Sequence, residues 1–575
     1  MPKTKKERIQ LAVNILIATV VPAMLFYLME FYEHNPFVEV RAEAQFFNVL
    51  IFELIGWGLF FICKKAMISL RILSICAMLF GLINHYVMKF RSTPFVPWDI
   101  FSIKTAKSVA GNYDFTPDVS TVIVTVLFLA AIAGLQFFHF QIELKIYYRL
   151  IPFAACFLLT ILFAKLLQDD EFQTKHYLYP FLFTPAYMTK VNGMTVTFMM
   201  NLEYVHVEKP SGYHADEAQE ILEEYDDDDS TVTEEYPNII VIMNEAFSDV
   251  GILSDFQTNE DYMPFMHSVM AGEVENTIHG YLNVSVCGGN TANTEFEFLT
   301  GNTMRFLPTG SIPYQQYVKN EMPSLARFLK TLGYETYGMH PYYASGWDRD
   351  TVYPLLGLDH TVFYEDWFYR SYLRSYISDA CDFDMIRQVY EKNSDSPLFL
   401  FNVTMQNHGS YSDAYENFHP NVTVSGSSQF ELSQYLSLIQ VTDRELADLI
   451  EYFKEQKEKT VVVFFGDHQP NDYTVRPIWS ASGDEEIRYQ VPYMIWANYD
   501  IPEKECDTSA NYLAAQMLED LGMPRSKYQN FLLELAKQYP IISSVRMEQT
   551  DDAQQEMLDT YQKLQYYSMF DYKAD

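Results

Sequence analysis

Five apolar stretches of bilayer length in the first 168 residues constrain this 575-residue chain more than any other feature. A helix needs about 20 predominantly apolar residues to cross about 30 Å of hydrocarbon. The first stretch is too long for a simple secretory signal and is poorly followed by a small-residue cleavage site, so we interpret it as retained. The sequence therefore predicts five transmembrane helices, at 11–31, 46–63, 68–88, 119–139 and 148–168.

Lysine and arginine in short loops predict the orientation of these spans, because such residues are held on the cytoplasmic side during insertion. Cations precede the first span and lie between spans two and three and between spans four and five: Lys3, Lys5, Lys6, Arg8, Lys64, Lys65, Lys145 and Arg149. The loop at 89–117 carries cations on the opposite side, and we interpret it as an amphipathic segment at the membrane surface. We expect a multi-pass cell-membrane protein with a cytoplasmic N-terminus and an extracellular remainder.

Charge divides the chain at the same place. Residues 1–168 contain 15 basic and 10 acidic side chains, whereas 169–575 contain 25 basic and 65 acidic side chains. This acidity argues against a nucleic-acid partner, because phosphates bind clustered cations. Residues 169–236 are predicted to be a juxtamembrane connector and acidic linker, and we interpret Asp226–Asp229 within it as solvated rather than as a calcium site.

The remainder of the chain has the pattern of an α/β domain. Short β-rich runs alternate with helical segments, which is typical of a mainly parallel sheet covered on both faces. A helix is predicted at 322–333, with Pro323 in its first turn and Gly333 as its C-terminal cap. We place this domain at 237–540 and a helical tail at 541–575. The clearest strands lie at 238–243, 334–339, 397–405, 460–466 and 491–497.

Polar or ionisable residues follow four of these strands, where open α/β sheets bind ligands. They are Asn244 and Glu245, then His340, then Gln406, Asn407 and His408, then Asp467 and His468. Any one of them could simply be a turn residue, but their joint placement favours a site. Two carboxylates and an imidazole, from Glu245, Asp467 and His468, suit a divalent cation.

Thr291 is the candidate fourth ligand and nucleophile. It follows Gly288 and Gly289 at the predicted start of a helix at 291–299, where the helix dipole is positive. Metal coordination would lower the pKa of its hydroxyl and make it a nucleophile toward phosphorus. The alternative is that Thr291 or Asn290 merely caps the helix.

These motifs resemble the alkaline phosphatase and sulfatase superfamily and, more narrowly, the lipoteichoic acid synthase family of polytopic phosphoglycerol transferases. The resemblance covers nearly the whole chain. It rests on the five spans and on 191–213, NIIVIMNEAFSD (238–249), GGNTANTEFEFLTG (288–301), HPYYASGWDRD (340–350), QNHGSY (406–411), FFGDHQP (464–470) and LQYYSMF (564–570).

The resemblance implies a sulfatase-like fold and a set of site residues. Glu245, Thr291, Asp467 and His468 would hold one divalent metal, most commonly Mn²⁺, with Mg²⁺ or Zn²⁺ as alternatives. Thr291 would be the nucleophile. Trp347, Arg349, His408 and His340 would hold the glycerol phosphate group. Arg349 and His408 would also be catalytic: Arg349 would stabilise charge on the phosphate oxygens, and His408 or His340 could protonate a leaving oxygen. A simpler interpretation of Trp347–Arg349 is a buried aromatic beside a surface ion pair.

The implied reaction transfers glycerol phosphate from phosphatidylglycerol to a glycolipid, polymer or glycan acceptor through a threonine-linked intermediate. Two alternatives remain: a phosphoethanolamine transferase with the same ligand set, and a non-catalytic membrane scaffold. A sulfatase is disfavoured, because Cys287 lacks the following proline and arginine needed to make formylglycine.

Overall fold

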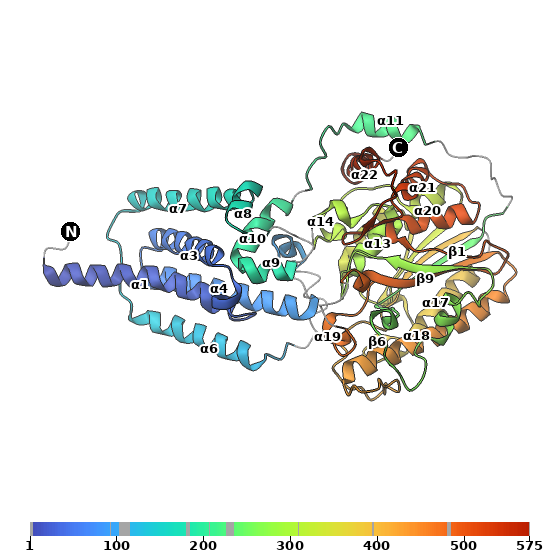
Figure 1. The fold of residues 1–575 in the computed structure, drawn as a ribbon, viewed down its shortest axis with the longest axis horizontal. Coiled ribbons are helices and arrows are strands. Elements are labelled where there is room, and N and C mark those ends of the chain that lie inside the picture. Colours follow the sequence, from blue (N-terminus) through green and yellow to red (C-terminus); the bar gives the residue numbers. More distant parts are fainter. Residues whose placement is uncertain are drawn as a thin grey trace. The chain divides into compact units, whose positions relative to one another are not determined.

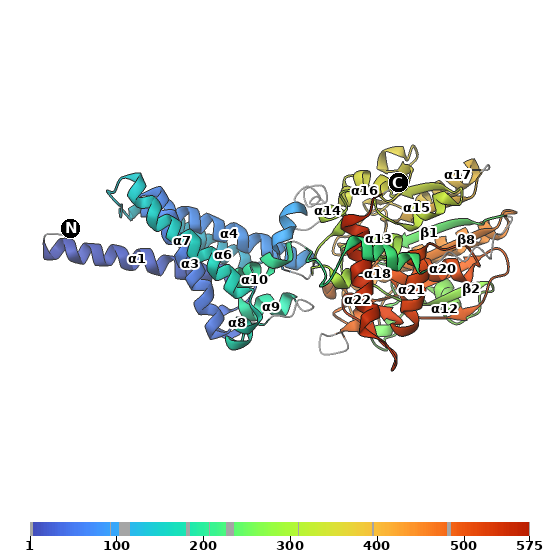
Figure 2. The same ribbon diagram turned by 90° about the horizontal axis from the view of Figure 1, so that it is seen from above.

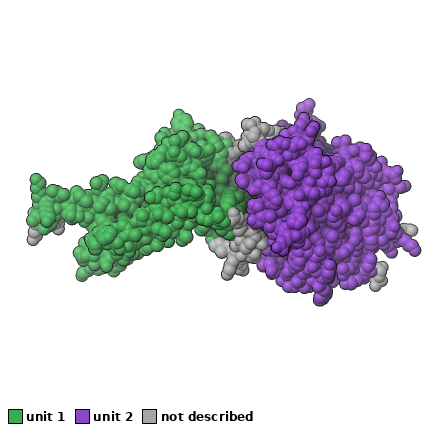
Figure 3. Space-filling view, turned by 90° about the horizontal axis from the view of Figure 1, so that it is seen from below, with its two compact units in different colours: residues 1–100, 114–206 green, residues 101–113, 207–575 purple. Residues whose placement is uncertain are grey.

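A computed structural model describes residues 4–91, 94–102, 115–179, 185–205, 207–225, 235–308, 310–393, 396–479 and 485–573. The chain forms two compact units (Figure 3). The helical unit comprises residues 1–100 and 114–206, and the sheet unit comprises residues 101–113 and 207–575. The Asp226–Asp229 run and residues 92–93 and 103–114 of the cationic loop at 89–117 lie outside the described residues.

The helical unit contains the five expected spans. Five of its helices are long and apolar enough to cross a membrane: α1 (Lys5–Glu30), α3 (Ala42–Cys63), α4 (Ala66–Arg91), α6 (Val119–Gly134) and α7 (Ile146–Leu167). Many of their large apolar side chains are exposed, among them Leu16 and Ile151, as expected for surfaces that face lipid. The shorter helices are α2 (Pro36–Glu39), η1 (Pro97–Ser102), η3 (Leu135–Phe137), α8 (Asp170–Lys175), α9 (Pro185–Asn192), α10 (Met194–Met200) and η4 (Asn201–Val205).

Buried polar groups on the spans bind the short helices that follow them. The Glu30 carboxylate accepts a hydrogen bond from the Met194 amide at 2.7 Å. Asn48 donates to the Asn192 carbonyl at 2.7 Å and accepts from the Val196 amide at 3.0 Å. Helix α10, which lies in the predicted connector, is therefore fixed to the bundle.

The sheet unit is built on a mainly parallel sheet with strand order β10-β2-β9-β8-β1-β7-β3-β4, and β11 pairs with β2. Strands β8, β1, β7, β3 and β4 run parallel, whereas β9 is antiparallel to both β8 and β2. All five predicted strands are present, and β2, β4, β10 and β11 were not predicted. The strands are β1 (Asn238–Asn244), β2 (Thr277–Asn283), β3 (Glu335–Met339), β4 (His360–Val362), β7 (Leu398–Val403), β8 (Thr460–Gly466), β9 (Gln490–Ala497), β10 (Lys504–Glu505) and β11 (Thr508–Ser509).

Helices cover both faces of this sheet (Figures 1 and 2). In β1, Ile239, Val241 and Met243 face one apolar core, and Ile240 and Ile242 face the other. The first core contains α13 (Thr291–Thr300), α15 (Leu325–Thr331), α16 (Arg349–Leu355) and α20 (Ala510–Asp520). The second contains α12 (Pro264–Met270), α17 (Asp379–Lys392) and α18 (Phe430–Lys454). A third cluster joins α11 (Ala215–Glu223), α21 (Lys527–Gln538) and α22 (Gln555–Tyr566).

The remaining elements are short. They are η6 (Val250–Leu253), η7 (Met304–Phe306), α14 (Pro313–Gln316), η8 (Gly346–Asp348), η9 (Tyr364–Asp366), β5 (Tyr372–Leu373), β6 (Tyr376–Ile377), α19 (Asp472–Val475), η10 (Glu486–Tyr489), β12 (Ile541–Ile542), β13 (Met547–Glu548) and η11 (Tyr567–Asp571).

One helix boundary differs from its prediction. The helix predicted at 322–333 begins at Leu325, and Pro323 lies before it. The Ser324 hydroxyl provides the cap by accepting a hydrogen bond from the Arg327 amide at 3.0 Å. Gly333 follows the helix with a φ of +90°, as expected for a C-terminal glycine.

We predict that the Phe298 side chain on α13 contributes strongly to the stability of the packing between this helix and the sheet. Its buried ring lies 5.8 Å from that of Phe401 and 5.1 Å from that of Phe465. Phe298→Ala should lower the free energy of unfolding by about 3–5 kcal/mol, because it leaves a cavity. Urea unfolding of the full-length protein in detergent, followed by tryptophan fluorescence, measures this change. Tyr473→Ala, at a 55% exposed residue, is the control, and equal effects of the two variants would contradict the prediction.

Candidate active site

Four neighbouring parallel strands bring the predicted residues to one edge of the sheet. Glu245 follows β1, and Asp467 and His468 follow β8, which pairs with β1. His408 lies beyond β7, and His340 follows β3. Because β8, β1, β7 and β3 are adjacent, their carboxyl ends meet at this edge, as the sequence predicted.

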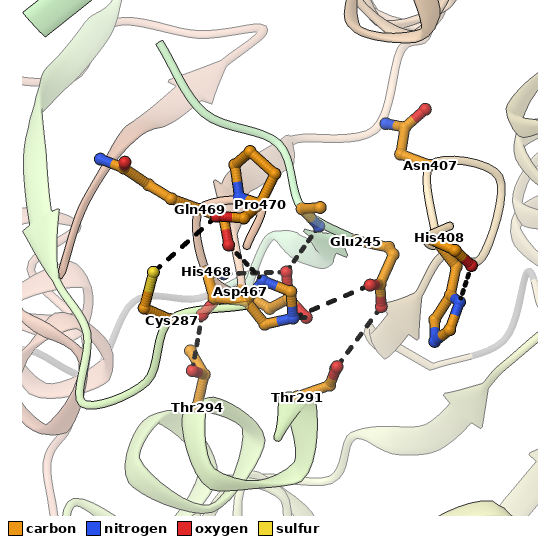
Figure 4. A network of polar contacts seen from close by, with 12 residues as sticks. Glu245, Cys287, Thr291, Thr294, Asn407, His408, Asp467, His468, Gln469 and Pro470 are labelled. Carbon is orange, nitrogen blue, oxygen red and sulfur yellow. Dashed lines mark hydrogen bonds and ion pairs between the residues drawn. The ribbon is translucent and has the colours of Figure 1, made fainter. Parts of the chain in front are cut away.

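Glu245, Asp467 and His468 form a compact buried cluster (Figure 4). Each offers a donor atom, and these atoms lie within 4.8 Å of one another. His468 Nε2 lies 3.2 Å from Asp467 Oδ2 and 3.8 Å from Glu245 Oε1. Burial raises the pKa of Glu245 well above its usual value, and the Asp467 charge raises it further. Two carboxylates held together away from water favour a bound cation.

The hydrogen bonds around this cluster fit a divalent metal. The amides of Ala246 and His468 donate to Asp467 Oδ1 at 2.7 and 2.8 Å. His468 Nδ1 donates to the Gln469 carbonyl at 2.9 Å, which leaves Nε2 as the ring atom that faces the two carboxylates. Asp467 Oδ2 and His468 Nε2 are buried without a hydrogen-bond partner among the described residues. Two carboxylates and one imidazole are ligands that suit Mn²⁺, Mg²⁺ or Zn²⁺.

Thr291 is the first residue of α13, and its hydroxyl donates to Glu245 Oε2 at 3.3 Å (Figure 4). The preceding Asn290 has a left-handed backbone conformation and makes no side-chain capping bond. The capping alternative is therefore not what the structure adopts. The helix is instead fastened to the site by Thr294, whose hydroxyl donates to the Asp467 carbonyl at 2.8 Å.

Gly466 sets the spacing between the two loops that carry the carboxylates. It ends β8 immediately before Asp467. A Cβ atom at this position would overlap the carbonyl oxygen of Phe247, which lies in the loop after Glu245. The close approach of the two loops therefore requires glycine at residue 466.

Arg349 is paired with Glu295, a residue that sequence analysis missed. Both side chains are buried, and Arg349 Nε donates to the two Glu295 carboxylate oxygens at 3.1 and 3.2 Å. The Tyr353 hydroxyl donates to the same carboxylate at 2.9 Å. The simpler interpretation, a surface ion pair, is wrong for Arg349. One sequence signal could have identified Glu295. It follows Thr291 by one helical turn, so both residues lie on the same face of the predicted helix.

His340 and His408 are neutral near pH 7. Burial lowers the pKa of His408 to about 4, and burial together with the Arg349 charge lowers the pKa of His340 well below its usual value. His408 Nδ1 lies 2.7 Å from the Gly409 carbonyl, and His340 Nδ1 lies 2.8 Å from the Val403 carbonyl. Each ring therefore holds its proton on Nδ1, which suits hydrogen bonding to a ligand better than proton donation. Trp347 is half-buried, with a φ of +57°.

The chain is similar to known proteins over part of its length. Residues 237–523 match the sulfatase family. A Rhizobium meliloti (strain 1021) protein named for cyclic beta-1,2-glucan modification is 31% identical over 371 residues, which are 61% of this chain and 56% of that protein. The lipoteichoic acid synthase of Staphylococcus aureus (strain USA300) is 24% identical over 238 residues, which are 40% of this chain and 35% of the synthase. The matched regions thus span about half or less of these relatives.

A solved structure supports the same fold. The Streptococcus pyogenes phosphoglycerol transferase GacH, solved with sn-glycerol-1-phosphate, aligns with a TM-score of 0.53 and 23% identity. The alignment covers 63% of this chain and 94% of that structure. Residues 237–523 are therefore a sulfatase-family domain, and part of the chain is similar to lipoteichoic acid synthases.

Proposed function

We propose that this chain is a membrane-bound, metal-dependent phosphoglycerol transferase that acts through Thr291. The observation that carries the proposal is the Thr291 hydroxyl, directed at Glu245 beside a buried carboxylate and imidazole cluster. Its donor would be phosphatidylglycerol, and its acceptor a cell-envelope glycolipid, polymer or glycan. The glucan in one relative's name and the glycerol phosphate in the solved transferase both accord with such chemistry.

Glu245, Thr291, Asp467 and His468 would hold one divalent metal, with Mn²⁺ as our first choice. When bound, such an ion neutralises negative charge on phosphate oxygens and lowers the pKa of a nearby hydroxyl. The protein holds the four side chains close together and shields them from water. Their burial strengthens every electrostatic interaction with a phosphate group.

The first step breaks the bond between the donor phosphate and diacylglycerol. Thr291 Oγ forms a new bond to phosphorus while its proton passes to Glu245 Oε2, which already accepts its hydrogen bond. The phosphorus–oxygen bond to diacylglycerol breaks, and diacylglycerol leaves as an alcohol after taking up the proton that Glu245 received. The product is a glycerol phosphate diester on Thr291.

The second step reverses these roles. An acceptor hydroxyl attacks the same phosphorus and loses its proton, the bond from phosphorus to Thr291 breaks, and the threonine oxygen regains a proton. Arg349, His340, Trp347 and His408 are proposed to hold the glycerol phosphate group during both steps. The neutral imidazoles would accept hydrogen bonds from glycerol hydroxyls, and the Arg349 charge is shared with Glu295.

The nucleophile is tested by intact mass measurement of the full-length protein in detergent after incubation with phosphatidylglycerol and Mn²⁺. We expect a glycerol phosphate adduct on the native protein and on Thr331→Ala, an exposed control. Thr291→Ala should carry none, because it lacks the attacking oxygen. An adduct that survives in Thr291→Ala would show that another residue is the nucleophile. An adduct formed only from phosphatidylethanolamine would identify a phosphoethanolamine transferase instead.

The metal site is tested by titrating Mn²⁺ into the purified protein in a calorimeter. Asp467→Asn and His468→Ala should each weaken Mn²⁺ binding by at least about tenfold, because each removes one ligand from a small set. His360→Ala, at an exposed histidine, should bind like the native protein. Native-like binding by both site variants would contradict the assignment.

The orientation is tested by cysteine labelling in intact cells, using a protein whose own cysteines have been replaced. Lys457→Cys, on the exposed surface of the sheet unit, should react with a membrane-impermeant maleimide. Lys6→Cys should react only after the cells are permeabilised, because the cations before α1 are expected in the cytoplasm. The reverse pattern would place the candidate active site inside the cell.

A further inference from the structure

A continuous series of aromatic rings leads from the candidate active site to the protein surface. We call Tyr376, Tyr342, Tyr343, Tyr364 and Tyr372 the tyrosine track. Tyr342 and Tyr343 belong to the HPYYASGWDRD motif (340–350), and the reaction proposed above uses none of the five.

The inner end of the track contacts both active-site histidines. The ring of Tyr376 lies 5.5 Å from that of His408, and its hydroxyl lies 3.2 Å from His408 Nδ1. The ring of Tyr342 lies 6.2 Å from that of His340 and 6.2 Å from that of Tyr376. These two tyrosines therefore form one wall beside His340 and His408.

The outer end of the track reaches solvent. Tyr342 contacts Tyr343 with 4.9 Å between ring centroids, and Tyr343 contacts Tyr364 at 5.2 Å. The hydroxyls of Tyr364 and Tyr372 are 2.7 Å apart. The exposed fraction rises from 5% at Tyr376 to 42% at Tyr343 and 40% at Tyr372. The rings thus lead from a buried inner end to an exposed outer end.

The track is held rigid from behind. The Arg370 guanidinium lies 4.0 Å from the centre of the Tyr364 ring and donates to the Tyr364 carbonyl at 2.7 Å. Arg374, which is buried, donates to the carbonyls of Gln406, His408 and Ser410 and lies over the Tyr376 ring. Preorganised rings bind a ligand at a lower entropy cost than mobile ones.

The acidic residues near the track favour a neutral ligand over an anionic one. Glu365 and Asp366 follow Tyr364 in the chain and are exposed. The exposed Asp350 donates its amide at 3.2 Å to the carbonyl of Ala344, the residue after Tyr343, whereas Arg370 is partly buried against Tyr364. A poly(glycerol phosphate) chain or an anionic membrane surface would meet like charge there. A neutral oligosaccharide would not, and its pyranose rings present apolar faces and hydroxyls to match the apolar body and polar tip of tyrosine.

We propose that the tyrosine track binds a neutral oligosaccharide and presents one of its hydroxyls to the active site as the acceptor. This inference rests on the proposed function. The oligosaccharide oxygen bonds to the phosphorus held on Thr291, the bond from phosphorus to the threonine oxygen breaks, and the hydroxyl proton is returned to Thr291. The oligosaccharide leaves with a glycerol phosphate substituent.

Binding is tested first, because it does not depend on turnover. The probe is a neutral glucan hexasaccharide, titrated into the full-length protein in detergent, with a glycerol phosphate hexamer as the anionic comparison. We expect hexasaccharide binding that weakens about tenfold in Tyr343→Ala and in Tyr372→Ala. Tyr473→Ala, which removes an exposed ring outside the track, should bind like the native protein. Equal hexasaccharide binding by native and track variants, or track-dependent binding of the hexamer alone, would overturn the proposal.

Transfer is tested second, with the Thr291 adduct as the internal reference. In the track variants, the rate of glycerol phosphate transfer to the hexasaccharide should fall about tenfold relative to the rate of adduct formation. An equal ratio in native and variant proteins would overturn the acceptor role. A missing adduct in the native protein would instead overturn the proposed function, and the binding measurement would still decide whether the track holds a glycan.

Discussion

Two buried carboxylates held close together are the constraint on which the rest of this site depends. Glu245 and Asp467 come from neighbouring parallel strands, and His468 completes a cluster within which the donor atoms lie 4.8 Å apart or less. Without a positive charge, such a cluster would oppose folding, because desolvation and mutual repulsion both act against ionised carboxylates. The amides around Asp467 and the hydroxyl of Thr291 reduce this cost only in part. The three side chains thus have the geometry of a group that could hold a metal ion.

Much of this arrangement can be predicted from sequence, because the signals are local. Apolar runs mark the spans and the central strands, and the residue after each strand lies at the ligand-binding edge by topology alone. Strand β2 was missed because His279 and Gly280 interrupt its apolar pattern, and the antiparallel direction of β9 leaves no trace in its composition. The start of α15 was misplaced because a proline suited to a first turn stands one residue before the serine that caps the helix.

The contacts that set the charges of the site residues could not be predicted from the sequence, because they join distant segments of the chain. Arg349 and Glu295 are 54 residues apart, and nothing local indicates that they share a buried ion pair. That pairing changes what Arg349 can offer to a phosphate, since part of its charge is already compensated. The neutrality of His340 and His408 likewise follows from burial, which only the folded chain defines. Sequence identified the chemical groups, and the fold determines their protonation.

Gly466 determines how closely the loops that carry Glu245 and Asp467 approach each other. Since any side chain there would push against the Phe247 carbonyl, the loops after β1 and β8 would separate before the strands themselves were disturbed. A variant of this kind would retain its secondary structure and yet hold Glu245 and Asp467 too far apart to share an ion. Attempts to redesign the chemistry of this domain are therefore better directed at the side chains that point into the site than at the backbone that spaces them, where tolerance to change is narrowest.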